Sequence, residues 1–178
     1  MIDHEKLLSQ VANGNNDAFE TLYSELSPML YSTILSHTHN VQAAEEITQD
    51  AFVKIYKSAG TFKGGSKVST WAYSIATRTM IDYQRKAQRD GLVFPEDLER
   101  TSNQADSNNP INVIEEEERK IYIYKAIDTL SANQKTAFIL AFIDGISQKE
   151  IASIMDMTVK GVESLLQRAK SKLRQKLK

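Results

Sequence analysis

The stretch from Ser147 to Leu173 constrains the fold most, because it contains two helix starts separated by only a few residues. Ser147 and Glu150 have the spacing of a capping box, and Thr158 is a good N-cap for a second helix. The apolar stripe of that second helix is Val162, Leu166, Ala169 and Leu173. Two short helices joined by a tight turn predict a helix-turn-helix, whose second helix can enter the major groove of DNA.

The face of the second helix opposite this stripe carries hydroxyl, amide and cationic side chains, which suit base edges and phosphates. The candidate DNA-binding residues are Lys160, Ser164, Gln167, Arg168, Lys170, Ser171 and Arg174. Their charge alone would favour a solvated helix whose basic end complements the helix dipole, and Glu163 weakens the local field. The pair of capped helices favours nucleic-acid binding.

Charge is unevenly distributed along the 178 residues, although the net charge is only −1. Residues 1–50 hold eight acids and one base, and residues 96–118 do the same. Residues 54–89 hold eight bases and one acid, and residues 160–178 hold seven bases and one acid. Two basic blocks separated by acidic ones predict two electrostatic footprints on one polyanion.

The composition excludes several classes of protein. The chain has no cysteine, which excludes disulfides and thiolate chemistry and is compatible with a reducing cytosol. It has no apolar run long enough to span a membrane, and its acidic N-terminus lacks the apolar core of a signal peptide. We therefore expect a cytoplasmic protein that is not an integral membrane protein.

Helical periodicity without strand alternation predicts an all-α fold of two small helical domains joined by an acidic, flexible linker. The expected domains are residues 1–92 and 113–178, and the linker is 93–112. Before the helix-turn-helix, helices are expected over 3–12, 17–35, 40–56, 70–89, 113–130 and 131–143. A second capping box, Ser131 with Gln134, begins the last of these, and Gly145 ends it in the left-handed conformation.

Several local features can be checked directly. Asp17, Asn40 and Ser69 are the expected N-caps of three helices. Pro28 should kink or split the helix that contains it. The expected inward stripe of the 40–56 helix is Ile47, Ala51, Phe52, Ile55 and Tyr56.

The first domain offers two candidate surfaces. Glu45, Glu46, Gln49 and Asp50 form an acidic helix face, which by itself is ordinary solvated surface. The loop from Gly60 to Lys67 is basic and flexible, and Trp71 falls within the apolar stripe of the helix after it. The nucleic-acid candidates from this loop and helix are Lys63, Ser66, Lys67, Tyr73, Arg78, Asp82, Arg85 and Lys86.

His37 and His39 raise the question of a metal site, because they are close together beside a loop. No third ligand is evident near them in the sequence, so we expect two loop histidines and no metal or cofactor.

With both domains placed, the chain resembles bacterial extracytoplasmic-function (group 4) sigma factors of the sigma-70 family over nearly its whole length. The first domain is similar to sigma region 2 in EEITQDAFVKIY and TFKGGSKVSTWAYSIATRTMIDYQRK. The second is similar to region 4 in AIDTLSANQKTAFILAFIDGISQKEIASIMDMTVKGVESLLQRAKSKL. The resemblance departs at Ser74, Arg78, Glu163 and Leu165, so base preferences of other members should not be transferred.

The resemblance implies a promoter-specificity subunit with no catalytic residues of its own. It places the acidic face of Glu45 to Asp50 on the clamp helices of the polymerase β′ subunit, and region 4 near the β flap. It assigns the Phe62 to Lys86 candidates to melting and base capture at the −10 element, and the second helix of the helix-turn-helix to the −35 element. It places the acidic linker in the polymerase channel. Family members associate with the nucleoid in the holoenzyme, and an anti-sigma factor at the inner membrane is a common partner.

Three alternatives have distinct consequences. A stand-alone helix-turn-helix regulator would bind closed duplex without polymerase. A metal protein using His37 and His39 would purify with stoichiometric metal. An adaptor would bind only proteins, and both basic blocks would be solvated surface.

Overall fold

The computed structural model describes residues 2–90, 119 and 121–177, and every regular element within them is helical. The N-terminal domain contains α1 (His4–Ala12), α2 (Asn16–Thr38), α3 (Val41–Ser58), the 3-10 helix η1 (Ala59–Thr61) and α4 (Val68–Arg89). The C-terminal domain contains helical residues 121–128, then α6 (Ala132–Phe142), α7 (Gln148–Ile154) and α8 (Val159–Lys176). The all-α prediction is confirmed. The predicted linker 93–112 lies outside the described residues. Residues 113–118 and 120 of the predicted 113–130 helix lie outside them as well.

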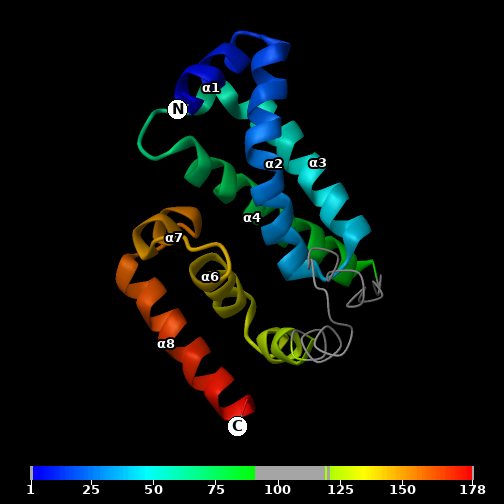
Figure 1. The fold of residues 1–178 in the computed structure, drawn as a ribbon, viewed down its shortest axis with the longest axis vertical. Coiled ribbons are helices and arrows are strands. Elements are labelled where there is room, and N and C mark those ends of the chain that lie inside the picture. The colour runs from blue at the N-terminus through cyan, green and yellow to red at the C-terminus, as the bar shows by residue number, and fades with distance from the viewer. Residues whose placement is uncertain (1, 91–118, 120, 178) are drawn as a thin grey trace, which may run out of the picture.

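The long helices α2, α3 and α4 form the core of the N-terminal domain, and α1 packs against one end of it (Figure 1). Its fully buried side chains include Leu22 and Leu30 of α2 and Ile47 and Ile55 of α3. Alanines such as Ala72 let α4 approach these residues closely. Helices α2 and α3 therefore bury one face each in this core, as their periodicity predicts.

Most predicted helix starts are confirmed. Asn40 and Thr158 accept hydrogen bonds from the backbone N–H groups of Ala43 and Gly161, at 2.8 and 3.1 Å. Both predicted capping boxes are present, at Ser131 and Ser147. Gly145 adopts the left-handed conformation, with φ of 67°.

Two predicted N-caps are wrong. The N-cap of α2 is Asn15, whose Oδ1 accepts a hydrogen bond from the N–H of Ala18 at 3.1 Å. Asp17 therefore lies in the first turn of α2, where its negative charge interacts favourably with the helix dipole. Helix α4 begins at Val68, one residue before Ser69, and the Val68 side chain is already buried in the core.

A split of α2 at Pro28 and an inward Tyr56 are also wrong. Pro28 does not split α2, which continues from Asn16 to Thr38. Pro28 is exposed and removes only one helical hydrogen bond, so the carbonyl left without that bond can be hydrated. Tyr56 is 41% exposed instead of inward, although its ring lies 5.1 Å from that of Phe19.

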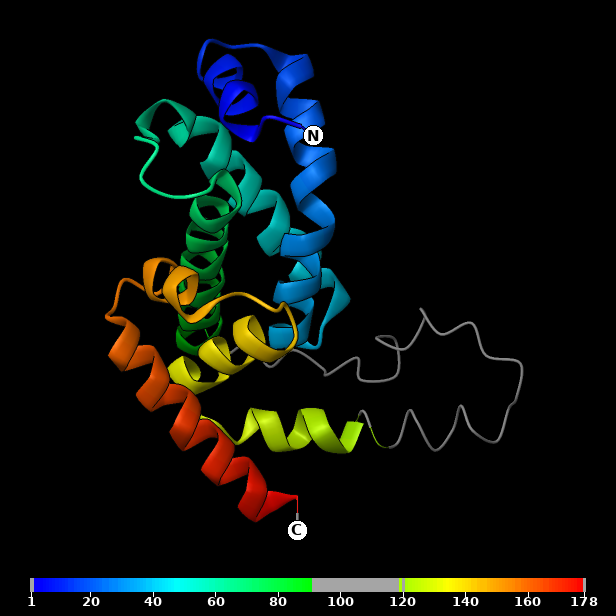
Figure 2. The ribbon, with the colours of Figure 1, turned by 60° about the vertical axis from the view of Figure 1, so that its left-hand side comes forward.

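The two domains pack directly on each other, α4 against α7 and α2 against α6 (Figure 2). One apolar cluster runs across the junction. It includes Ile34, Tyr73 and Met80 from the N-terminal domain and Ala137, Leu140, Ile151 and Ile154 from the C-terminal domain. A second cluster, with Ile127, Leu130, Ile139, Ala169 and Leu173, belongs to the C-terminal domain alone. The arrangement presents α8 on the outside.

Candidate nucleic-acid and protein interfaces

Helix α8 presents the predicted polar face to solvent. Its buried residues are Val162, Leu166, Ala169 and Leu173, as the periodicity predicts. Of the seven candidate DNA-binding residues, Ser164 is partly buried and the other six are exposed: Lys160, Gln167, Arg168, Lys170, Ser171 and Arg174. The Arg168 guanidinium donates to the hydroxyl of Ser164 at 2.8 Å, which aligns it along the helix. The structure therefore brings this predicted surface together.

Contacts from neighbouring elements fix α8 in place. Lys170 lies over the Phe142 ring of α6, with 4.6 Å between Nζ and the ring centroid. Lys172 donates to the backbone carbonyl of Thr129, and the hydroxyl of Tyr122 donates to the carbonyl of Lys176 at 3.1 Å. A rigid helix keeps its donors preorganised for a ligand.

The basic loop and α4 carry the second predicted surface. Lys63, Arg78, Arg85 and Lys86 are exposed, and Ser66 is partly buried. Asp82 is exposed and lies 4.0 Å from Lys54 of α3, which offsets its charge. Lys67 is also exposed, but its Nζ lies 2.9 Å from the Glu150 carboxylate of α7. This ion pair and the Ser147 hydroxyl hold the pKa of Glu150 below its ordinary value.

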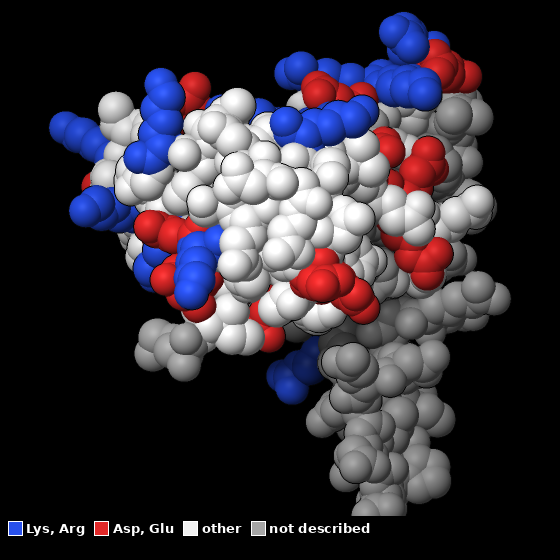
Figure 3. Space-filling model, turned by 90° about the horizontal axis from the view of Figure 1, so that it is seen from above, with Lys and Arg blue, Asp and Glu red and all other residues white. Residues whose placement is uncertain are grey.

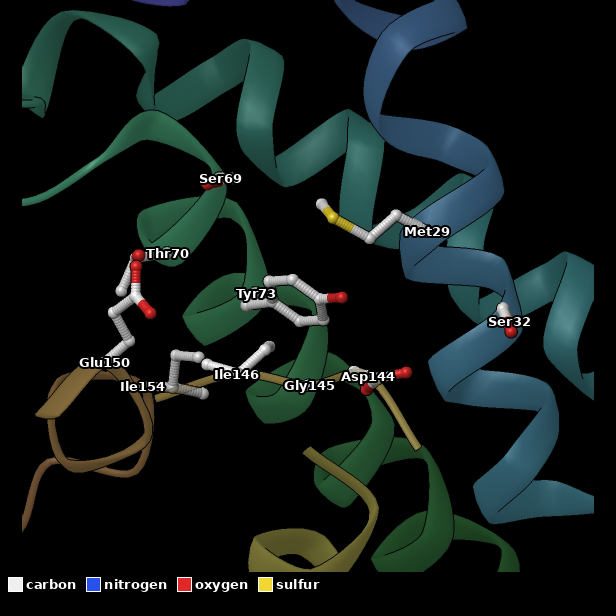
Figure 4. A pocket seen from close by; sticks show the side chains of 10 residues that line it. All are labelled: Met29, Ser32, Ser69, Thr70, Tyr73, Asp144, Gly145, Ile146, Glu150 and Ile154. Carbon is white, nitrogen blue, oxygen red and sulfur yellow. The ribbon is translucent and has the colours of Figure 1, made fainter. Parts of the chain in front are cut away.

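Tyr73 does not lie on the surface as predicted. It is 4% exposed, and it projects from α4 toward α2 beside the loop that carries Asp144 and Ile146 (Figure 4). Burial raises its pKa to about 12. At about 100° per residue, Tyr73 lies about 140° from Arg78 and about 180° from Asp82, so helical spacing contains the signal for this correction.

Trp71 was assigned to the core by its place in the apolar stripe, but it is only partly buried. Its ring packs against that of Phe62 in the basic loop, with 5.5 Å between centroids. On the helical wheel Trp71 falls within about 20° of Arg78 and Asp82. The aromatic residue that shares a face with the α4 charges is therefore Trp71.

The acidic face of α3 is exposed at all four predicted positions: Glu45, Glu46, Gln49 and Asp50. The Tyr83 hydroxyl of α4 donates to the Glu46 carboxylate at 3.0 Å; burial and this bond raise the pKa of Tyr83 to about 12. Sequence reasoning missed two apolar neighbours on this face, Val53 and Tyr56, which are 50% and 41% exposed. Their spacing from Gln49 is the signal for them, since residues four and seven apart share a helix face.

Charges are partly segregated on the molecular surface as well as in the sequence. Viewed from the end that carries α1, basic side chains line two edges around a broad uncharged area, and acidic side chains gather along another side (Figure 3). Such segregation permits separate contacts with a polyanion and with a basic protein surface.

His37 and His39 have structural roles at the domain junction. The His39 Nε2 lies 3.1 Å from the Asp128 carboxylate, and the ring packs edge-on to Tyr124 at 5.0 Å. Burial lowers the pKa of His37 to about 3, and the nearby Lys135 ammonium contributes. Among the described residues no group of three or more His, Cys, Asp or Glu could hold a metal ion.

Comparisons with known proteins agree with this arrangement. Residues 22–90 match the Sigma-70 region 2 family and residues 120–173 match the Sigma-70 region 4 family. The chain is 31% identical to the ECF RNA polymerase sigma factor SigW of Bacillus subtilis over 180 residues, covering 98% of this chain and 96% of that protein. It is 28% identical to the RNA polymerase sigma-H factor of Pseudomonas aeruginosa, covering 93% and 89% of the two chains.

Two solved structures have the same fold. One is CnrH in complex with the cytosolic domain of CnrY, with a TM-score of 0.70, 24% identity and coverage of 98% of this chain and 97% of that chain. The other is the sigma factor RpoE in complex with the anti-sigma factor NepR from Bartonella quintana, with a TM-score of 0.70, 26% identity and coverage of 89% and 96%.

None of the helices described is both long and apolar enough to cross a membrane. The two family matches occur in the predicted order and on the predicted domains. The full-length similarity to SigW extends across both. The chain therefore belongs to the extracytoplasmic-function group of the sigma-70 family, whose members are not enzymes but the subunits that direct bacterial RNA polymerase to promoters.

Proposed function

We propose that this sigma factor docks on core polymerase through α3 and reads its promoter with α8 at the −35 element and with the basic loop and α4 at the −10 element. The single observation that carries the proposal is the exposed donor face of α8 on a fully capped helix-turn-helix. Run-off transcription with core polymerase and a promoter library tests it. Defined start sites are expected, and their absence from every template would contradict the proposal.

The −35 contact combines base and phosphate recognition. Gln167 and Lys160 can reach base edges, while Arg168, Lys170 and Arg174 extend along the helix as phosphate ligands. Ser164 aligns Arg168 and so reduces the entropy lost on binding.

The −10 contact uses Trp71 in addition to the charged side chains of α4. An aromatic ring beside a basic loop can stack on an unpaired base, which contributes about 1–3 kcal/mol per base. Trp71 packs on Phe62 and shares the face of Arg78 and Arg85, which supports this role. Tyr73 stays a candidate only for a conformation in which the two domains have separated.

Polymerase docking uses the acidic face of α3, extended by Val53 and Tyr56. The four polar positions supply charge complementarity to a basic helix pair, which accelerates association. The exposed apolar side chains supply the buried contact that affinity needs. The β flap is the corresponding contact for the C-terminal domain.

We place this activity in the cytoplasm, on the nucleoid when the chain is in the holoenzyme, and at the inner membrane if an anti-sigma factor holds it there. RpoE of Bartonella quintana, 26% identical, was solved with its anti-sigma factor, which supports an anti-sigma partner here. The domain boundaries 1–92 and 113–178, and a role for the acidic linker in the polymerase channel, stay predictions.

A further inference from the structure

Glu163 is the only acid on α8, a helix whose sequence otherwise carries six basic residues. Its side chain is exposed, and it makes no ion pair or hydrogen bond with another residue in the described part of the chain. A carboxylate on a helix that approaches phosphates weakens binding, unless the DNA donates a hydrogen bond to it. The position of Glu163 therefore needs a physical explanation.

Two ordinary roles of an acid on a helix do not apply to Glu163. A favourable interaction with the helix dipole is confined to the first turn, and Glu163 is the fifth residue of α8. Its neighbours four residues away, Val159 and Gln167, carry no charge, and Lys160 three residues before it forms no ion pair with it. Glu163 therefore contributes little to the stability of the helix.

Glu163 lies beside the side chains that we assign to base edges. At about 100° per residue, it is about 40° from Gln167 and about 60° from Lys160 around the helix. In a helix-turn-helix, base edges are contacted by the N-terminal part of the second helix, which contains Glu163. Toward the C-terminus the same side of α8 forms a groove of about 490 Å³, lined by Gln167, Lys170, Ser171, Arg174 and Gln175. The cations of that groove suit phosphates, so Glu163 lies at the base-reading end.

We propose that Glu163 determines specificity at the −35 element: its carboxylate accepts a hydrogen bond from the N4 amino group of a cytosine in the major groove. The inference rests on the proposed function, which places α8 in that groove. It adds a residue that reads one base pair by its negative charge, next to side chains that read by donating.

The choice of cytosine follows from what each base presents. An ionised carboxylate only accepts hydrogen bonds, and the donors in the major groove are cytosine N4 and adenine N6. Adenine places its N7 acceptor beside N6, which repels the second carboxylate oxygen and suits the amide of Gln167 better. Guanine and thymine present only acceptors for hydrogen bonds. Glu163 should therefore favour cytosine and disfavour guanine and thymine most.

The surroundings of Glu163 make this contact feasible. The N-cap hydroxyl of Thr158 accepts from the N–H of Gly161 at 3.1 Å, and Lys170 lies over the Phe142 ring, so the first turns of α8 are held in place. Lys160 and Lys170 lie on the same side of the helix, and their attraction to phosphates offsets the repulsion of one carboxylate. A preorganised acceptor can then discriminate between bases without losing the affinity of the helix.

The test uses the full chain with core polymerase and a promoter library randomised over the −35 element, and the transcripts are sequenced. The wild type should prefer cytosine about tenfold at one position. Glu163→Ala should lose this preference at that position and no other, and Glu163→Gln should shift it toward adenine, which an amide reads with two hydrogen bonds. If Glu163→Ala keeps every base preference and only binds all sequences more tightly, the carboxylate merely repels phosphates and the inference is wrong.

Lys170→Ala is the matched control on the same helix. It should weaken binding to all sequences and flatten the log–log salt dependence by about one unit, while the base preferences stay. Glu163→Ala should leave the thermal melting curve unchanged, because the side chain is exposed and makes no contact that the fold needs.

A second selection separates this inference from the proposed function. The full chain without polymerase selects from the same library as duplex DNA. A cytosine preference that Glu163→Ala removes, without any transcription start site, would support the reading by Glu163 and contradict the proposed function. Defined start sites with a −35 preference that Glu163→Ala leaves intact would do the reverse. No sequence selection in either assay would overturn both.

Discussion

Helices α8 and α4, which we propose contact promoter DNA, differ in how much of their surface the rest of the protein covers. Helix α8 buries one stripe of four residues and leaves its opposite face open. Helix α4 packs against α3 of its own domain and against α7 of the other, and its Thr70 and Tyr73 line a cavity together with Glu150 and Ile154 of α7. Sequence periodicity predicts the buried stripe of α8 correctly, and the described helices that pack on it, α6 and α7, belong to its own domain. It describes α4 incompletely, because the second partner belongs to a distant part of the chain.

The largest expected effect is the loss of polymerase docking without loss of the fold. Asp50→Lys reverses a charge on the exposed face of α3 and should abolish co-purification with core polymerase, while circular dichroism stays unchanged. Glu20→Lys, an exposed acid on α2, is the control and should retain binding. If Asp50→Lys still co-purifies, the docking face is elsewhere.

The second prediction concerns which aromatic residue of α4 contacts promoter DNA. Trp71→Ala should slow promoter opening by about 10-fold to 100-fold through lost stacking, measured with permanganate on unpaired thymines. Tyr73→Phe should leave opening near the wild-type rate, because the ring stays in the domain junction. The reverse ranking would show that the junction opens to present Tyr73.

A third test concerns the buried His37 at the junction. Its pKa of about 3 in the folded protein lies below the ordinary 6.5, so folding requires the neutral ring. The contribution of the neutral His37 ring to the free energy of unfolding is complete above pH 6.5, and it is lost as the pH falls from 6.5 toward 3. Between pH 7.5 and 5.5 the wild type should lose about 1.4 kcal/mol more unfolding free energy than His37→Leu, as measured by urea titration. Equal losses would mean that His37 is hydrated in solution.

Arg168→Ala tests the open face of α8. If the guanidinium neutralises one phosphate, the variant should bind −35 duplex more weakly, and its log–log salt dependence should flatten by about one unit. Fluorescence anisotropy at several salt concentrations gives the slope. An unchanged slope would leave Arg168 as a partner of Ser164 only.

Much of the fold and part of the site follow from local sequence rules. The capping boxes at Ser131 and Ser147 and the stripe of α8 depend on residues within a few positions of each other. The acidic face of α3 follows from the same periodicity. The misassigned caps at Asp17 and Ser69 are errors of one or two residues, because several polar side chains near a helix start can serve as the cap.

The remaining errors involve contacts distant in sequence. Tyr73 is buried because Asp144 and Ile146, more than 70 residues later, lie beside it. His37 and His39 are expected to be loop histidines, but His37 lies in α2, both are buried, and their partners are Lys135 and Asp128. No periodicity within a single helix can reveal such pairs.

The apolar cluster that crosses the junction affects how long the unbound subunit survives. If the domains part without polymerase, Leu140, Ile151 and Ile154 lose cover and become sites for proteolysis and aggregation. Reclosing hides them again within the same molecule. The cellular supply of this subunit would then depend on how tightly its two domains pack, and variants that weaken this packing would be degraded faster.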